Sequence, residues 1–533
     1  MWRAYVAVVI GALTACNAGD DEPTCEEIVW ISDDDGDGWG KEYRGCTRPE
    51  VITPAARTGD CHDDDATAFP GSTSLERPFD GIDTDCDGND FCTDLNCDGR
   101  PDVAIPSHHD GDYMISQPAR LLSTADGHRL EATDVPMNGS LGVVIADFNE
   151  DGYQDIVHAS YHDGTSPATS SFVYWGPDHT VASRQGLPTT GAYWPCVGDL
   201  DGNGWLDIVF ADYNDGDYQT QSFVYWNRGG AFSATDRLPL ATVGATQCAI
   251  EDLDGDDRPE IVFSSYTDGT THALESYVYW GSASNDFEVR TALPTVGAYA
   301  LSIADVDGNG LPDLVFWSHT NGTSHVTDRN FVYWNRQGAF SASDRLELAS
   351  MGGFRGAVVD LDGDGRNEII APGYFDGTSH AGALTYIYWG NADGTWGSSR
   401  TSLPAPGVLD VVVEDINADG HPDILLASHY DGDSYAPSVI YWGSADGAYG
   451  TTARTELPGY HVTWGTGVAD FNRDGYKDVL IPGYHNNTTG MDTAPWENQA
   501  FTRIYWGSSV GVRPGLYDQW PTRGAWSVAI AGK

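Results

Sequence analysis

The sequence predicts an all-β protein: a β-propeller of about eight four-stranded blades, closed by the C-terminal strand and preceded by a small disulfide-rich module. Three observations lead to this prediction. An Asp-rich nonapeptide recurs eight times between residues 94 and 478. The segments between its copies alternate short β-branched or aromatic runs with Gly-rich turns and lack helical periodicity. The chain also ends on a segment that matches the one preceding other copies of the nonapeptide.

The eight copies begin 52 to 55 residues apart, a regular period that is typical of repeat architectures. Each period holds four short strand-like runs, as a propeller blade requires. The copies are DLNCDGRPD from Asp94, DFNEDGYQD from Asp147, DLDGNGWLD from Asp199, DLDGDDRPE from Asp252, DVDGNGLPD from Asp305, DLDGDGRNE from Asp360, DINADGHPD from Asp415 and DFNRDGYKD from Asp470.

The two ends of the repeat region predict how the ring closes. The copy at Asp94 lacks a preceding strand, because a cysteine-rich segment runs directly into it. The C-terminal run GAWSVAIAGK from Gly524 matches GAYALSIAD from Gly297, which precedes another copy. We therefore expect the C-terminal strand to complete the first blade, which removes two exposed sheet edges. Eight blades are expected, and seven with one irregular repeat is the alternative.

The nonapeptides have the composition of calcium-binding loops. Positions 1, 3, 5 and 9 hold Asp, Asn or Glu in every copy. Ca²⁺ takes about six to eight oxygen ligands, and position 7 would add its backbone carbonyl. Plain acidic turns are the alternative, but they would leave three or four carboxylates repelling one another in each loop. We predict about eight Ca²⁺ ions in the propeller, held by Asp94, Asn96, Asp98, Asp102, Asp147, Asn149, Asp151, Asp155, Asp199, Asp201, Asn203, Asp207, Asp252, Asp254, Asp256, Glu260, Asp305, Asp307, Asn309, Asp313, Asp360, Asp362, Asp364, Glu368, Asp415, Asn417, Asp419, Asp423, Asp470, Asn472, Asp474 and Asp478.

Position 6 of the nonapeptide predicts one weaker loop. It is Gly in seven copies, as expected where a tight turn needs positive φ. The exception is Asp257, and Asp adopts positive φ less readily than Gly. We therefore expect the loop 252–260 to bind Ca²⁺ more weakly, despite its four carboxylates.

The N-terminus is typical of an exported protein. Arg3 precedes an apolar run over residues 4–12 that is too short to span a membrane stably. The segment LTAC, ending at Cys16, resembles a bacterial lipobox, in which the Cys carries lipid. We expect a lipoprotein signal peptide over residues 1–16 and a tether over 17–24, with an ordinary signal peptide as the alternative. The predicted location is the bacterial outer membrane or cell surface, with a lipid anchor.

Cysteine usage agrees with an oxidising compartment. Six cysteines lie between residues 25 and 97, which predicts a disulfide-stapled module over residues 25–93 before a propeller over 94–533. Spacing does not decide the connectivity, and sequential pairing is one possibility. Cys196 and Cys248 lie in neighbouring repeats one residue out of register, so free thiols and a disulfide are equally compatible.

The loops, the period and the closing strand resemble FG-GAP or VCBS repeats, the calcium-binding propeller blades also found in integrin α-chain heads. The resemblance covers roughly residues 94–533. It implies that positions 1, 3, 5 and 9 bind Ca²⁺ through their side chains. It also implies a recognition scaffold, often extracellular, without identifying a ligand.

The N-terminal module resembles a different family, the MopE-type metal-binding motif of bacterial surface proteins. The resemblance rests on DDDGDGWG from Asp33, GDCHDDD from Gly59 and DGIDTDCDG from Asp80. Most of its candidate ligands are hard oxygens, which favour Ca²⁺ over copper, and His62 is the only His between residues 30 and 90. The predicted ligands are Asp33, Asp35, Asp37, Asp83, Asp85 and Asp87.

Charge and motifs limit the function. A formal net charge of −52 would repel nucleic acid and anionic lipid. The sequence has no HExxH motif and no distinct carboxylate pair outside the loops, so a catalytic site is not indicated. We expect a calcium-stabilised, monomeric cell-surface scaffold for recognition or adhesion that binds a glycan or protein partner. The alternatives are a carbohydrate-active enzyme (a polysaccharide lyase or hydrolase) and a purely structural calcium-binding envelope protein.

Four aromatic residues are candidates for ligand contact. Tyr193 and Tyr299 each lie two residues after the Gly that opens a pre-loop strand, and Trp464 has the equivalent place in its repeat, six residues before the acidic loop. This position is expected near the mouth of the central channel. Filling of the core is the alternative role for these three. Trp496 belongs to an insertion over residues 485–501, which makes the last repeat the most individual.

Overall fold

The computed structural model describes residues 28–32, 41–45, 61, 68, 86, 92–108, 119–123, 130–134, 138–325, 329–391, 396, 400–432, 436–445, 447–459, 462, 464–484, 500–522 and 524–532. All regular elements in these ranges are β-strands, and none of these residues form a helix of the length and apolarity needed to cross a membrane. Contacts divide the chain into two units. The first unit comprises Met1–Arg100 and Asp151–Tyr153, and the second comprises Pro101–Glu150 and Gln154–Lys533. In the first unit, β1 (Ile28–Ser32) pairs antiparallel with β2 (Lys41–Gly45).

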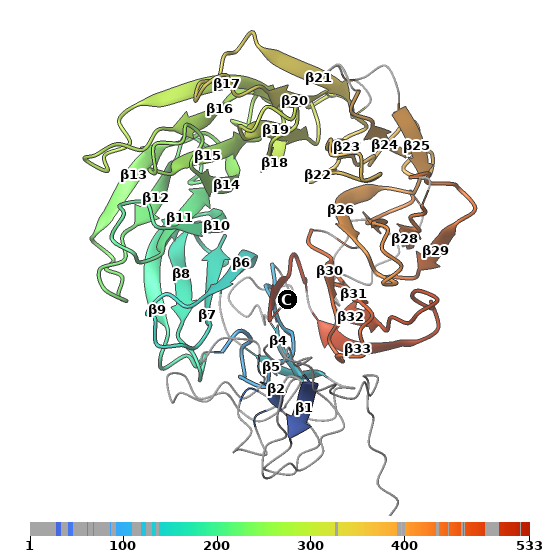
Figure 1. Ribbon diagram of the computed structural model, residues 1–533. Helices are drawn as coiled ribbons and strands as arrows, with labels where there is room; N and C mark the ends of the chain where they lie inside the picture. Colours follow the sequence, from blue (N-terminus) through green and yellow to red (C-terminus); the bar gives the residue numbers. More distant parts are fainter. Residues whose placement is uncertain are drawn as a thin grey trace, which may run out of the picture. The chain divides into compact units, whose positions relative to one another are not determined.

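The second unit is built from antiparallel sheets of four strands, which follow one another around a ring (Figure 1). Seven of these sheets consist of four consecutive strands each. Their strands are β6 (Ser140–Ala146), β7 (Asp155–Ser160), β8 (Ala168–Tyr174), β9 (Gln185–Thr190); β10 (Ala192–Gly198), β11 (Asp207–Asp212), β12 (Gln221–Tyr225), β13 (Arg237–Ala241); β14 (Ala245–Glu251), β15 (Glu260–Ser265), β16 (Ala273–Tyr279), β17 (Arg290–Val296); β18 (Ala298–Ala304), β19 (Asp313–Ser318), β20 (Arg329–Tyr333), β21 (Arg345–Ala349); β22 (Ala357–Val359), β23 (Glu368–Ala371), β24 (Leu384–Tyr388), β25 (Arg400–Pro404); β26 (Val408–Glu414), β27 (Asp423–Ser428), β28 (Ser438–Tyr441), β29 (Arg454–Leu457); and β30 (Gly467–Ala469), β31 (Asp478–Ile481), β32 (Ala500–Tyr505), β33 (Tyr517–Thr522).

The remaining strands of this unit form a composite sheet that joins the two ends of the repeat region. Its order is β34 (Ala529–Ala531), β3 (Asp102–Ile105), β4 (Ala119–Ser123) and β5 (Leu130–Asp134). The C-terminal strand pairs with β3 as expected, with Asp102 opposite Ala531. The prediction of about eight four-stranded blades is nevertheless wrong. Seven blades are regular, whereas the first repeat enters a composite sheet because no strand of its own precedes its acidic loop.

Each regular blade places its first strand toward the centre of the ring and its fourth strand at the outside (Figure 1). The first strands of successive blades contact one another, and β34 contacts both β6 and β30. The second strand lies between two neighbours in its sheet and is covered by the adjacent blades. Every residue of β11, β15 and β19 is therefore buried. This burial accounts for the continuous apolar runs that follow each acidic loop in the sequence.

An aromatic cluster fills the region between the first strands. Tyr299 stacks on Phe354 with ring centroids 3.9 Å apart, and Trp194 stacks on Trp464 at 4.8 Å. The hydroxyl groups of Tyr193 and Tyr299 contact each other. The rings come from different blades, so this cluster joins blades that are distant in the sequence.

Disulfides form at three of the cysteine pairs in the described residues. Cys61–Cys86 and Cys92–Cys97 agree with sequential pairing. Cys196–Cys248 joins β10 to β14, so these two cysteines form a disulfide and are not free thiols. Cys25 and Cys46 lie outside the described residues.

Candidate metal sites in the acidic loops

The acidic nonapeptides connect the first and second strands of the blades. Six copies, from the loop 199–207 to the loop 470–478, lie entirely in the second unit. Position 9 opens the second strand and pairs with the residue before position 1, as Asp313 does with Ala304. Position 2 is an apolar residue buried beneath the loop, such as Val306. Each loop is thus closed by a ladder pair and anchored by one core side chain.

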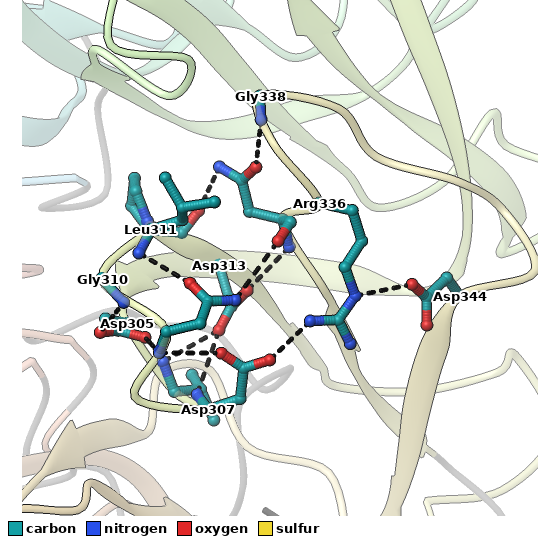
Figure 2. A network of polar contacts seen from close by, with 12 residues as sticks. Asp305, Asp307, Gly310, Leu311, Asp313, Arg336, Gly338 and Asp344 are labelled. Atoms are coloured by element: carbon teal, nitrogen blue, oxygen red, sulfur yellow. Dashed lines mark hydrogen bonds and ion pairs between the residues drawn. The ribbon is translucent and has the colours of Figure 1, made fainter.

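Position 1 organises the turn through its carboxylate. In the loop 305–313, the backbone N–H of Asn309 donates to Asp305 Oδ1 at 3.0 Å, and that of Gly310 donates to Oδ2 at 2.8 Å. The N–H of Leu311 donates to Asn309 Oδ1 at 2.8 Å (Figure 2). The bond from position 6 to the first carboxylate recurs in the other five loops, at 2.8 to 3.0 Å.

Position 9 is held by two backbone donors. Asp313 Oδ2 accepts the N–H of Val306 at 2.9 Å, and Oδ1 accepts the N–H of Asn335 at 2.8 Å. The same pair of bonds holds Asp207, Glu260, Glu368, Asp423 and Asp478. These carboxylates are therefore positioned by the blade itself.

The carboxylates converge in four of the six loops. One oxygen each from positions 1, 3 and 9 lies within 4.8 Å of the others in the groups Asp199–Asp201–Asp207, Asp252–Asp254–Glu260, Asp305–Asp307–Asp313 and Asp360–Asp362–Glu368. The loops 415–423 and 470–478 carry Asn at position 3, so only two of these three positions are acidic there. A compact set of hard oxygen donors fits Ca²⁺.

Two positions of the turn adopt left-handed backbone conformations. At position 6, Asp257 has φ of 64°, close to the conformation of the glycines that replace it elsewhere. Position 4 shares the feature, with φ of 57° at Ala418 and 56° at Arg473. The strain expected at Asp257 is thus not unique to its loop, because non-Gly residues at position 4 carry the same cost. Weaker binding by the loop 252–260 remains a prediction.

The family comparison follows the same loops. A model of the FG-GAP-like repeat matches residues 199–263, 252–316, 305–371 and 415–481. Each match begins at position 1 of an acidic loop and ends in the second strand of the next blade. Residues 199–371 and 415–481 thus match FG-GAP-like repeats. The matched segments overlap and together cover less than half of the chain.

Curated proteins that are similar to this chain include integrin α chains. Human integrin alpha-6 is 33% identical over 159 residues, which are 28% of this chain and 14% of that protein. Human integrin alpha-7 is 31% identical over 150 residues, covering 25% of this chain and 12% of that protein. The chain thus spans about one seventh or less of these relatives' length.

Solved structures with a similar fold share little sequence. One describes the recognition of non-reducing terminal N-acetylglucosamine by an Agrocybe aegerita lectin, with 14% identity, 68% of this chain and 91% of that chain covered, and a TM-score of 0.37. Another is the V. cholerae biofilm matrix protein Bap1, with 13% identity, 80% and 81% covered, and a TM-score of 0.35. Scores at this level contribute nothing to the assignment of function.

Burial perturbs the position-9 acids of the FG-GAP-like loops. Desolvation by burial is the main cause, since it disfavours the charged form, and neighbouring loop carboxylates add to it. It raises the pKa to about 7 for Asp207, Glu260, Glu368 and Asp478, and to about 6 for Asp313 and Asp423. A bound divalent cation would favour the ionised form of these groups.

The raised pKa values predict a pH dependence of the metal-free protein. A carboxyl that holds its proton more tightly in the folded state stabilises the fold at low pH, and this stabilisation is lost as pH rises from about 4 through about 7. We expect the melting temperature in EDTA to fall by at least about 5 °C between pH 5 and pH 8. Calcium should abolish this decline, because the ion replaces the protons. Scanning calorimetry in EDTA and in Ca²⁺ measures both, and a metal-free melting temperature that rises over this window would contradict the prediction.

The first two copies of the loop cross the division between the two units. In the first unit, Asp94 repeats the position-1 pattern, since its Oδ2 accepts the N–H of Gly99 at 2.7 Å. Burial raises the pKa of Asp94 to about 6. In the second unit, Asp102 and Asp155 are buried. Metal binding by these two copies remains a prediction.

The other predicted site residues divide into buried and undescribed ones. Tyr193, Tyr299 and Trp464 belong to the aromatic cluster and are 7%, 5% and 0% exposed, which favours the core-filling alternative. Undescribed positions include the lipidation candidate, the N-terminal metal ligands and the Trp of the insertion: Cys16, Asp33, Asp35, Asp37, Asp83, Asp85, Asp87 and Trp496.

Sequence reasoning missed two arginines beside the loops. Arg336 pairs with Asp307 at position 3 of its loop, with Nη1 and Oδ2 2.7 Å apart (Figure 2). Arg228 pairs with Asp201 in the same way. Both follow the motif Trp-Asn in the turn between the third and fourth strands, where other blades have Trp-Gly. The replacement of Gly by Asn after the Trp is the sequence feature that could have identified these arginines.

Proposed function

We propose that this protein is a calcium-stabilised recognition scaffold of the cell surface that binds a protein or glycan partner without chemical turnover. One observation supports the calcium part above all. In six FG-GAP-like loops the carboxylate of position 1 is held by the same backbone hydrogen bond, which the N–H of position 6 donates.

Calcium in these loops would act on the fold. Side chains at positions 1, 3, 5 and 9 would hold the ion, and the carbonyl of position 7 would complete the set. Because position 9 opens the second strand and position 1 follows the first, each ion would join two strands at their hairpin. The acids would then be neutralised without losing their hydrogen bonds. Including the copies at Asp94 and Asp147, about eight ions are proposed.

The recognition part rests on the similarity to integrin α chains, which covers 28% of this chain at best in the two human relatives described. We further propose export, a lipid anchor at Cys16, and a metal-binding module over residues 25–93 that precedes the propeller. The net charge of −52 favours partners other than nucleic acid.

Substitution of a position-1 residue tests the calcium sites individually. Asp305→Ala removes the acceptor of two turn N–H groups and one expected ligand. We expect the number of bound Ca²⁺ ions to fall by one and the melting temperature in Ca²⁺ to fall by about 2–4 °C. Native mass spectrometry and calorimetry measure these quantities. Asp178→Ala, an exposed acid outside the loops, is the control and should change neither. An unchanged ion count in Asp305→Ala would exclude this loop as a site.

Ligand binding needs its own experiment. The purified protein is applied to arrays of glycans and of cell-surface proteins, in Ca²⁺ and in EDTA. Saturable binding that disappears in EDTA is expected. Depolymerisation of a polysaccharide by the protein would favour the carbohydrate-active enzyme, and calcium binding without any ligand would favour the purely structural alternative.

A further inference from the structure

Two of the six loops carry an additional cation of the protein's own. Arg336 donates from Nη1 to Asp307 at 2.7 Å and from Nε to Asp344 at 2.9 Å, so it connects the loop 305–313 to the turn before β21 (Figure 2). Arg228 connects Asp201 to Asp236 in the equivalent way. In both loops the arginine forms an ion pair with the carboxylate of position 3, and that carboxylate is an expected calcium ligand.

The preceding asparagine holds each arginine in place. Asn335 Nδ2 donates to the carbonyl of Leu253 at 2.7 Å and to that of Pro312 at 3.0 Å. Its Oδ1 accepts the N–H of Gly338 at 2.9 Å. Asn227 repeats these contacts, with Phe148 and Leu206 as the carbonyl partners. The turn that carries the arginine is therefore fixed to its own loop and to the loop of the preceding blade.

The charge of these loops differs from that of the others. The loops 199–207 and 305–313 have Asn at position 5, so each combines three carboxylates with one arginine from outside the loop. The loop 252–260 has five carboxylates, Asp257 included, and the loop 360–368 has four; each also has an arginine at position 7 that pairs with position 5. Compared with the loops 252–260 and 360–368, the two arginine-bridged loops thus have the smaller excess of negative charge.

We propose that Arg228 and Arg336 set the calcium affinity of these two loops by acting as built-in counter-ions at position 3. An arriving Ca²⁺ needs the carboxylate that the guanidinium already neutralises, and the two cations repel each other at short range. The two loops therefore take up Ca²⁺ after the loop 360–368, whose position 3 has no such partner from outside the loop among the described residues, and they keep part of their structure without the ion. This inference rests on the proposed calcium binding and adds an order of loading.

The test is a Ca²⁺ titration of the full chain, followed by calorimetry and native mass spectrometry. The variants are Arg228→Gln, Arg336→Gln and the double substitution. We expect the sites in the loops 199–207 and 305–313 to gain roughly 3- to 10-fold in affinity in the double variant, because both arginines are half-exposed and salt screens their field. Arg336→Lys keeps the charge and should stay close to the natural affinity. Arg513→Gln is an exposed control and should leave every site unchanged.

A second variant acts in the opposite direction. Asp344→Asn removes the negative charge of the other partner of Arg336, so the guanidinium neutralises Asp307 more fully. The calcium affinity of the loop 305–313 should therefore decrease. Equal or lower affinity after Arg→Gln, in protein with a normal melting temperature in Ca²⁺, would overturn the inference while leaving calcium binding intact. If a glutamine variant does not fold, an affinity unchanged or raised in Asp344→Asn would overturn it instead. A natural protein that binds no Ca²⁺ would refute the proposed function itself.

Discussion

Removal of calcium is expected to lower the melting temperature by more than about 10 °C. Without the ions, each loop gathers three or four carboxylates at positions 1, 3, 5 and 9, within a chain whose net charge is −52. Groups that include the buried position-9 acids lie within 4.8 Å of one another in four loops. Their repulsion acts at the hairpin between the first and second strands of the blades, so many small destabilisations add up across the ring.

The measurement is scanning calorimetry at pH 8 in EDTA and in excess Ca²⁺. EDTA saturated with calcium beforehand controls for effects of the chelator itself. Raising the NaCl concentration in EDTA should recover only part of the loss, because screening weakens repulsion but supplies no ligand. A melting temperature that is indifferent to EDTA would count against structural calcium in these loops.

Trp464→Ala is expected to destabilise the protein by about 3–5 kcal/mol. Trp464 is fully buried and stacks on Trp194, with further ring contacts to Tyr299 at 5.3 Å and Phe354 at 5.9 Å. The residues belong to different blades, so truncation would open a cavity in the cluster that joins the first strands. Partial collapse around the cavity would lessen the loss, but the rings are held by separate sheets.

Urea unfolding in Ca²⁺ measures the change in the free energy of unfolding. Val510→Ala, at a side chain that is 70% exposed, should change it by less than about 0.5 kcal/mol. If Trp464→Ala left stability unchanged but abolished ligand binding, Trp464 would be a recognition residue, as its position in the sequence first indicated.

Much of the candidate site was predictable because its determinants are local. The nine residues of a loop contain the carboxylates, the turn glycine and the buried apolar residue at position 2, and a regular period repeats them. The two hydrogen bonds that the carboxylate of Asp305 accepts come from backbone N–H groups only four and five residues further along the chain. The alternation of short apolar runs and turns likewise indicated four strands per repeat.

The features that were missed involve residues distant in the sequence. Arg336 and Asp307 are 29 residues apart, and no pattern within the nonapeptide indicates their contact. The left-handed conformation of Ala418 and Arg473 at position 4 was also missed, because neither residue favours it.

The sequence by itself determined the repeat, the all-β strand order, the acidic loops and the pairing of the C-terminal strand, because period and polarity pattern are properties of neighbouring residues. Tertiary structure alone decided that the ring has seven regular blades. It also decided that Tyr193, Tyr299 and Trp464 pack in the aromatic cluster. The ion pairs of Arg228 and Arg336 with loop carboxylates likewise depend on it. Those outcomes depend on how curved sheets bring separate blades together, and contact between blades is set by the geometry of the whole ring.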